Sequence, residues 1–321
     1  MTGHTNRIGW DELPGPLRAA FTTAMGAAVT TEQRQTGGFS PGLASRLTLA
    51  DGRRVFLKAI STARDPHAPA LYRREAQVMR DLPATAPAPR LRWSYDDGTW
   101  VALALDDIDG HPPAQPWTIR DLDRVVTALA AMADTLTPAF DGALPITDDL
   151  ADNFSSWRRM AAGDGPHRPD RLPARARDNL DLLADLESGW AEAATGKTLA
   201  HTDLRADNLL LTRDTVMVVD WPYAVTTTPW MDLLFLLPSV AAFSGIDPEP
   251  VWRAHPHTRT VPAEQVDAVL AALCGDHLTQ SLRPPPANIP GLRAHQAAKG
   301  QAGLTWLMDR RAARARRTLY R

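Results

Sequence analysis

The sequence predicts an α+β protein with two lobes, a small β-rich lobe followed by a larger, mainly helical lobe. Three observations support this fold class. The chain has 321 residues, which is long for one compact core. Apolar and polar residues alternate over much of the first third, and apolar residues recur at helical spacing over most of the remainder. Because GHPP at 110–113 breaks these patterns, we predict a first lobe over residues 1–107 and a second over residues 108–321.

The composition is that of an ordinary globular protein, with 44% hydrophobic and 22% charged residues. A net charge of −2 gives no reason to expect nucleic acid or a membrane as a partner. The single cysteine, Cys274, excludes an internal disulfide and a multi-cysteine metal site, and it fits a reducing cytoplasm. Neither a secretory signal nor an apolar stretch of about 20 residues is visible. We therefore expect a cytoplasmic protein, either a monomer or a homodimer.

The predicted first lobe begins with a helix and a short strand over about 10–30. A Gly-rich loop and a β-hairpin follow over Gln35–Ile60, with ADG at 50–52 as the turn. Helical spacing predicts a helix over Ala70–Leu82. A proline-rich loop then leads to two strands, LRWSY and TWVALALDDI. In the second lobe we predict one β segment, at 209–220, among helices over about 118–137, 149–162, 173–194, 230–243, 263–282 and 291–317.

Polar side chains gather in LAHTDLRADNLLL, residues 199–211, just before a buried strand. Two short apolar runs, LLLT and TVMVVDW, flank an Arg-Asp turn and predict a tight hairpin. Because a hairpin returns the chain to its start, we expect Asp203 and Asn208 to meet Asp220 at the open end. Polar groups at the ends of buried strands must be paired, bound to metal or used in function.

Two carboxylates and an amide oxygen in that arrangement suit Mg²⁺, which takes a few protein oxygens together with substrate phosphates. We predict that Asn208 and Asp220 bind the metal and that Asp203 accepts a proton from an incoming hydroxyl. Phosphoryl transfer needs this division between charge neutralisation and a base.

The run HTDLRADN followed by VVDW resembles the catalytic loop and metal-binding aspartate of the protein-kinase-like superfamily. It is most similar to the aminoglycoside phosphotransferase family, which has choline kinase and homoserine kinase-like relatives. The resemblance implies the same roles for Asp203, Asn208 and Asp220, and it implies that His201 braces the loop.

One position of the loop departs from the family pattern, and another can be interpreted in two ways. Thr202 stands where the family usually has glycine, so we expect an unstrained backbone there. Arg205 is either a cationic clamp on the γ-phosphate or a partner of Asp207.

The rest of the kinase pattern follows in the same order along the chain. VFLKAI supplies Lys58 for the α- and β-phosphates, and YRREAQVM supplies Glu75 to orient it. WVALALDDIDG resembles the segment that holds the adenine, and Asp232 stands where a residue usually braces the catalytic loop. The expected nucleotide contacts besides Lys58 and Glu75 are Gly37, Gly38 and Ser40 of the Gly-rich loop and Leu103 and Leu105 of the adenine segment.

The resemblance implies a protein-kinase-like fold that transfers the γ-phosphoryl group of Mg·ATP, or of GTP, to a hydroxyl of a small molecule. Pro229–Asp232 follows Asp220 too soon to leave room for the activation loop of a protein kinase, which argues against a protein substrate. One alternative is a metabolic kinase acting on choline, homoserine, a sugar or a secondary metabolite. Another is a catalytically weak nucleotide-binding protein that regulates a partner, although such proteins usually lose one of the catalytic residues retained here.

The distribution of charged residues is the only indication of the chemical class of the acceptor substrate. Residues 101–200 hold 17 acidic and 9 basic side chains, and residues 292–321 hold 1 acidic and 8 basic ones. We expect the basic run DRRAARARR at 309–317 to form a solvated helix face, with binding of an acidic partner as the alternative. By resemblance, an aminoglycoside would be held by acids, a quaternary ammonium by an aromatic box and a macrolide by an apolar pocket. Acids that either hold a polycationic antibiotic or lie on solvated helix faces are Asp148, Asp149, Asp152, Asp276 and Asp309.

Overall fold

The structure, a computed structural model, describes residues 7–35, 41–164, 169–286 and 289–319. The chain divides into two compact units, each of which takes two segments. Unit 1 comprises Met1–Pro112 and Ala206–Tyr223, and unit 2 comprises Pro113–Arg205 and Ala224–Arg321. The boundary near Pro112 lies close to the predicted one. The segment 206–223, which we had assigned to the second lobe, contacts unit 1 instead.

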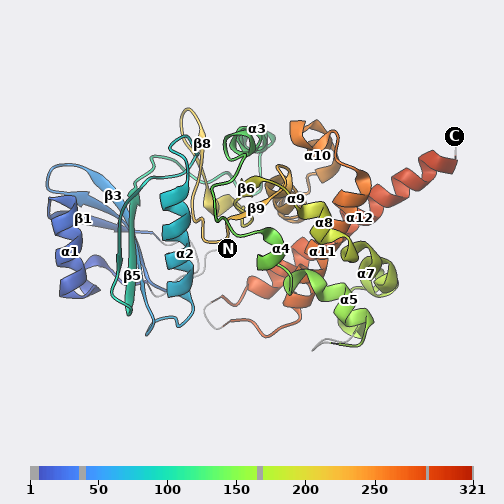
Figure 1. Ribbon diagram of the computed structural model, residues 1–321, viewed down its shortest axis with the longest axis horizontal. Coiled ribbons are helices and arrows are strands. Elements are labelled where there is room, and N and C mark those ends of the chain that lie inside the picture. Colours follow the sequence, from blue (N-terminus) through green and yellow to red (C-terminus); the bar gives the residue numbers. More distant parts are fainter. Residues whose placement is uncertain (1–6, 36–40, 165–168, 287–288, 320–321) are drawn as a thin grey trace. The chain divides into compact units, whose positions relative to one another are not determined.

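Unit 1 is built on a five-stranded antiparallel sheet with the strand order β1-β2-β3-β5-β4 (Figure 1). Each strand and helix that we predicted for this part of the chain is present. The elements are η1 (Trp10–Glu12), α1 (Gly15–Met25), β1 (Val29–Arg34), β2 (Leu43–Leu49), β3 (Arg54–Ser61), α2 (Ala68–Asp81), β4 (Leu91–Asp96) and β5 (Trp100–Asp106).

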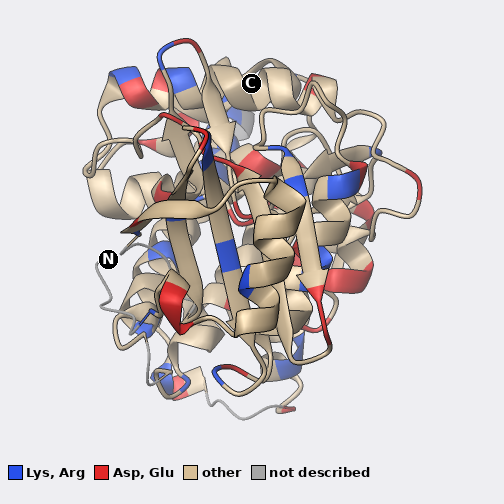
Figure 2. Cartoon of the chain, turned by 90° about the vertical axis from the view of Figure 1, so that its left-hand side faces the viewer, with Lys and Arg blue, Asp and Glu red and all other residues tan. Residues whose placement is uncertain are grey.

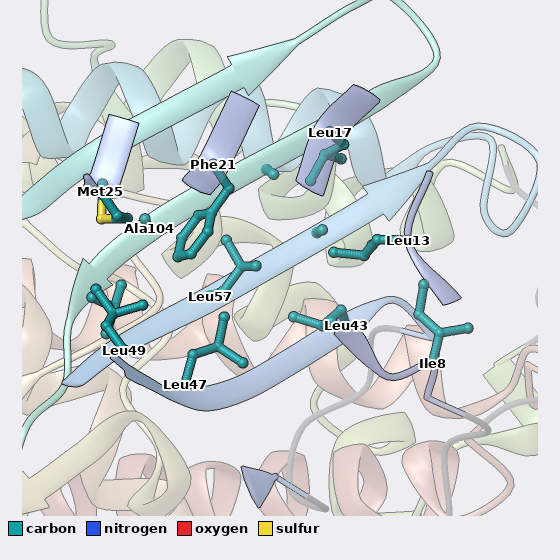
Figure 3. Close-up of a cluster of buried hydrophobic side chains, with 13 residues drawn as sticks. Ile8, Leu13, Leu17, Phe21, Met25, Leu43, Leu47, Leu49, Leu57 and Ala104 are labelled. Atoms are coloured by element: carbon teal, nitrogen blue, oxygen red, sulfur yellow. The ribbon is translucent and has the colours of Figure 1, made fainter. Parts of the chain in front are cut away.

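Helices α1 and α2 lie on opposite sides of this sheet (Figure 1). On the α1 side, Phe21 packs with Leu47 and Leu57 in a cluster of buried apolar side chains (Figure 3). Successive side chains of a strand point to opposite faces, so burial of Leu57 on this face sends Lys58 to the other. The alternating pattern of β3 therefore packs α1 with one set of residues and presents Lys58 on the α2 side with the other.

A short hairpin completes unit 1. It consists of β7 (Leu209–Leu211) and β8 (Val216–Val218), which pair antiparallel, and it follows η4 (Ala206–Asn208). The predicted hairpin is thus confirmed. Backbone hydrogen bonds join Leu211 to His111 and Val218 to Pro87, which explains why the hairpin belongs to unit 1.

Unit 2 is mainly helical, and its long helix α11 packs against α12 and α7. It adds a two-stranded sheet, β6 with β9, which the sequence did not predict. Its elements are α3 (Ile119–Thr135), α4 (Ile146–Asp149), η2 (Asn153–Ser155), α5 (Ser156–Ala161), η3 (Pro169–Arg171), α6 (Ala174–Arg177), α7 (Leu180–Ser188), α8 (Trp190–Ala194), β6 (Thr198–Ala200), β9 (Val225–Thr227), α9 (Met231–Ser244), α10 (Pro248–Ala254), η5 (Pro256–Thr258), α11 (Ala263–Ser281) and α12 (Leu292–Leu319).

Two predicted helices of this unit are in fact several short ones. The helix predicted over 149–162 is broken at Phe154, whose φ of −91° and ψ of 33° are not helical. The helix predicted over 173–194 is divided into α6, α7 and α8, with a break at Gly189. A helix at 248–254, α10, was missed.

The basic run of α12 differs from the predicted solvated face. Asp267 of α11 is fully buried, and Arg310, Arg311 and Arg314 all approach its carboxylate. Arg310 also binds Glu249. The cations of this run therefore attach α12 to α11 and α10, while Arg316 stays exposed.

Acidic and basic positions are interspersed along the ribbon in the view of Figure 2. Among the described helices, none combines the length and the apolar character needed to cross a bilayer.

Candidate functional site

Polar residues of unit 1 that the sequence motifs single out meet at Lys58. Its Nζ lies 2.6 Å from Oε2 of Glu75 on α2 and 2.6 Å from Oδ1 of Asp220, which follows β8. The ammonium also lies 5.0 Å from the ring centre of Tyr72. The sequence predicted the pairing of Lys58 with Glu75, and the structure adds Asp220 to it.

Burial and charge act against each other in this cluster. Burial alone would lower the pKa of Lys58, but the carboxylates of Asp220 and Glu75 together raise it above the ordinary value. Burial raises the pKa of Glu75, although the Lys58 ammonium opposes that change. Lys58 is therefore a firmly protonated cation held between two carboxylates.

The open end of the β7–β8 hairpin brings Asn208 and Asp220 together. The amide N–H of Val219 donates to the carbonyl oxygen of Asn208 at 2.9 Å, one residue before Asp220. Asp220 adopts a left-handed backbone with φ of 69°, and its side chain is 41% exposed. One carboxylate and one amide form a hard-oxygen donor set, which fits Mg²⁺ that also binds phosphate oxygens. That Asp203 joins these two residues stays a prediction.

The catalytic-loop sequence of unit 2 follows β6 and is held by one buried carboxylate. Asp232, near the start of α9, accepts hydrogen bonds from the backbone N–H of His201 at 3.0 Å and of Thr202 at 2.8 Å. Burial raises the pKa of Asp232, and these contacts oppose the change. His201 is fully buried, and its Nδ1 accepts a hydrogen bond from the backbone N–H of Asp203 at 3.3 Å. The expected bracing by Asp232 and His201 is present.

One expectation for this loop was not met. Thr202 has φ of 60°, so the backbone there is left-handed and our expectation of an unstrained backbone was wrong. A residue branched at Cβ is a genuine outlier in this region, and the hydrogen bonds that the backbone N–H groups of His201 and Thr202 donate to Asp232 hold it there. Arg205 lies near Asp203, with Nη1 and Oδ2 3.6 Å apart. That it clamps the γ-phosphate or pairs with Asp207 stays a prediction.

The expected adenine residues lie on β5. Lys58 pairs with Leu103 and Phe56 pairs with Leu105 across β3 and β5, so both leucines share the sheet face of Lys58. Both are buried. The expected phosphate contacts Gly37, Gly38 and Ser40 lie outside the described residues.

The sequence interpretation missed a polar cavity in unit 2. Asp152, Asp164 and Asp276 line this cavity of about 310 Å³, whereas Asp309 pairs with Arg175.

Comparison with known proteins identifies the family to which the chain belongs. A model described as "Phosphotransferase enzyme family" matches residues 36–284, which is more than half of the chain. A search of curated proteins found no match.

Several solved structures are similar. A thermostable mutant of aminoglycoside phosphotransferase APH(4)-Ia, in a ternary complex with ADP and hygromycin B, has a TM-score of 0.60 and 18% identity over 89% of this chain and 98% of that one. Amicoumacin kinase hAmiN, in complex with AMP-PNP, Ca²⁺ and Ami, has a TM-score of 0.55 and 13% identity over 89% and 92%. Macrolide 2'-phosphotransferase type I has a TM-score of 0.52 and 18% identity over 89% and 95%. At these identities the likeness shows the fold, and the predicted kinase-like fold class is confirmed.

Proposed function

The chain belongs to the phosphotransferase enzyme family and is a kinase that phosphorylates hydroxyl groups of small molecules, and we propose how its residues divide that work. The observation that carries the proposal is the ammonium of Lys58, fixed by Glu75 and Asp220. A cation held so firmly is suited to receive phosphate oxygens of a nucleotide.

The nucleotide is ATP in this proposal, with GTP as the alternative. Leu103 and Leu105 supply an apolar surface for the base, because they lie on the sheet face of Lys58. Lys58 binds the α- and β-phosphates, and Glu75 keeps it oriented. Backbone N–H groups of the loop that contains Gly37, Gly38 and Ser40 cover the phosphates.

Asn208 and Asp220 are the residues that would hold Mg²⁺. When bound, the ion neutralises charge on the phosphate oxygens. Asp220 would have to release its contact with Lys58 in order to hold the ion, and its side chain is 41% exposed.

Asp203 is the proposed catalytic base. Its carboxylate takes the proton of the acceptor hydroxyl, and His201 positions it through the hydrogen bond to its backbone N–H. Arg205, 3.6 Å from Asp203, holds a positive charge beside this carboxylate. Asp232 holds the loop through the backbone N–H groups of His201 and Thr202.

The test is ADP release from Mg·ATP, measured with purified protein and a panel of hydroxyl acceptors that includes hygromycin B, a macrolide, choline, homoserine and sugars. We expect turnover that depends on one acceptor. Asp203→Asn should lower kcat by a factor of about 10² to 10⁴, which is the usual contribution of a general base, and should leave nucleotide binding intact. Asp220→Ala should abolish Mg²⁺-dependent nucleotide binding.

Turnover by Asp203→Asn at the wild-type rate would contradict the assignment of the base. Lack of Mg·ATP binding by the wild-type protein would contradict the proposed nucleotide site. Lys197→Met, a change at an exposed lysine, serves as the control.

A further inference from the structure

A buried carboxylate lies where the chain leaves the strand that carries the proposed base contacts. Asp107 follows β5 directly, and its side chain is 1% exposed. Nε of Arg46 lies 3.0 Å from one of its oxygens, Oδ1, and Nε of Arg54 lies 3.2 Å from the other, Oδ2. Because an unpaired carboxylate at this depth would be costly, the two cations hold Asp107 in one place.

The two arginines lie on the sheet face that carries Lys58. Arg54 is on β3, four positions before Lys58, and every second residue of a strand points to the same side. Arg46 is on β2 opposite Phe56, which in turn lies opposite Leu105 on β5. The order along this face is therefore the arginines, then the apolar pair that Phe56 and Leu105 form, and then the lysine.

The same cluster fixes the connector that follows β5. Nη2 of Arg46 donates to the carbonyl oxygen of Ile108 at 3.0 Å, so one guanidinium holds two consecutive residues of the connector. At the other end, His111 exchanges two backbone hydrogen bonds with Leu211 of β7, at 3.2 Å and 2.8 Å. The connector from Asp107 to His111 is therefore attached both to the sheet that would hold the base and to the hairpin that carries the proposed metal ligands.

We propose that Asp107 is a positioning residue of the nucleotide site. It holds Arg46 and Arg54 at the end of the apolar pair and fixes the adjoining connector, so that the surface for the base is formed before the nucleotide arrives. Without this carboxylate, two long side chains and the connector must be ordered when the nucleotide binds, which costs binding free energy. This inference rests on the proposed function, in which Leu105 contacts the base and Lys58 the phosphates.

The test compares two ligands of the full-length protein, Mg·ADP, which has a base, and Mg·pyrophosphate, which has phosphates only. Calorimetry measures the Kd for Mg·ADP, and competition against Mg·ADP measures the Kd for Mg·pyrophosphate. We expect Asp107→Asn to raise the Kd for Mg·ADP about 10-fold, since each of two arginine side chains that must be ordered again costs a factor of a few. The Kd for Mg·pyrophosphate should not change, because Lys58 and the proposed metal ligands are intact. A merely structural role would lower the melting temperature without separating the two ligands.

Variants of the two arginines rank the contacts. Arg46→Gln should raise the Kd for Mg·ADP more than Arg54→Gln does, because Arg46 holds both Asp107 and Ile108, whereas Arg54 contacts the carboxylate and is 51% exposed. If Asp107→Asn does not fold, these two variants still decide the question. Asp51→Asn is the matched control, because it removes the acid of an exposed aspartate–arginine pair in the turn between β2 and β3 and should leave both constants unchanged.

The proposal is overturned if Asp107→Asn binds Mg·ADP as tightly as the wild-type protein does, if the two constants rise by the same factor, or if Arg46→Gln binds Mg·ADP like the control. Failure of the proposed function has a different signature. In that case the wild-type protein itself binds neither Mg·ADP nor Mg·pyrophosphate, whatever the variants do.

Discussion

The charge of Lys58 balances two carboxylates in a buried part of unit 1. Its ammonium is 12% exposed and neutralises Glu75, which is 1% exposed, together with Asp220. Removing the cation leaves a buried carboxylate without compensation, which costs far more than the ion pair itself contributes. The pair is therefore expected to matter for stability as well as for nucleotide binding.

We predict that Lys58→Met lowers the free energy of unfolding by about 3 kcal/mol at pH 7, measured by urea denaturation. The pKa of Glu75 is already raised by burial and rises further without Lys58. A carboxylate whose folded-state pKa lies above its unfolded value loses stability as the pH rises, so the variant should recover as the pH falls toward 5. The double variant Lys58→Met/Glu75→Gln should be more stable than Lys58→Met. Equal stabilities would contradict the buried-charge explanation.

At the same scale, the backbone of Thr202 marks where the sequence pattern misled us. The family motif has glycine there, and a glycine position often means positive φ. We expected an unstrained backbone because threonine rarely adopts a positive φ. Instead, the carboxylate of Asp232 accepts hydrogen bonds from two consecutive N–H groups and holds the backbone in the left-handed conformation. A contact 30 residues away along the chain thus overrides a local preference.

Among elements, the contact between α11 and α12 explains the basic C-terminal run. Asp267 is fully buried in α11 and is approached by three arginines one helical turn apart or less. Spacing alone showed that these arginines share one face, but it did not show which element that face meets.

We predict that Asp267→Asn lowers the free energy of unfolding by about 3 kcal/mol, because it removes the buried anion that Arg310, Arg311 and Arg314 share. Denaturation of the full chain measures this change. Glu264→Gln on the same helix is the control, because Glu264 is exposed and its loss should have little effect. If the free energy of unfolding fell as little in Asp267→Asn as in the control, the ion pairs of Asp267 with the arginines would not contribute to stability as predicted.

The segment between α10 and η5 carries a buried histidine. His255 is 1% exposed, and neither ring nitrogen has a hydrogen-bond partner among the described residues. Burial, assisted by the nearby His257, lowers the pKa of His255 to about 4, and Asp134 opposes this. The folded protein therefore keeps this imidazole neutral at pH values where the unfolded chain protonates it.

We predict that this histidine destabilises the protein as the pH falls from about 6.5 to about 4. In that window the unfolded state binds a proton that the folded state does not, so stability rises with pH. The shift amounts to about 3 kcal/mol. His255→Leu should flatten the pH dependence of the free energy of unfolding by about one proton, while His67→Gln, at an exposed position, should not. An unchanged slope in His255→Leu would contradict the prediction.

At the scale of the whole molecule, the proposed catalytic residues are divided between the two units. Unit 1 contains Lys58, Asn208 and Asp220, and unit 2 contains Asp203. The chain passes from one unit to the other between Arg205 and Ala206, inside the catalytic-loop motif. A single motif of eight residues thus supplies both units with a functional side chain.

We predict that Mg·ADP stabilises the protein by about 2.7 kcal/mol at 100 times its Kd, seen as a rise in the melting temperature. EDTA should remove most of this effect, and Asp220→Ala should abolish it. Stabilisation that is independent of Mg²⁺ would contradict the assignment of Asn208 and Asp220 as metal ligands.

Local patterns were sufficient for much of this protein. Alternation and turn residues predicted each strand of the five-stranded sheet, and the motif residues predicted the hairpin and the pairing of Lys58 with Glu75. The strands and the hairpin depend on side-chain periodicity over a few residues, which can be read from the sequence, whereas the pairing of Lys58 with Glu75 was implied by the family resemblance. Short elements were missed, because β6 and β9 have three residues each and pair only after the chain folds.

By itself, then, the sequence determined the fold class and the family, and it predicted the residues that we propose carry the chemistry. The tertiary structure alone decided which charges face each other: Lys58 with Asp220 across 162 positions, and Asp267 with the arginines of α12. The reason is physical. Periodicity fixes which residues share a face, whereas the partner of that face depends on the packing of distant segments, where burial makes each unpaired charge costly.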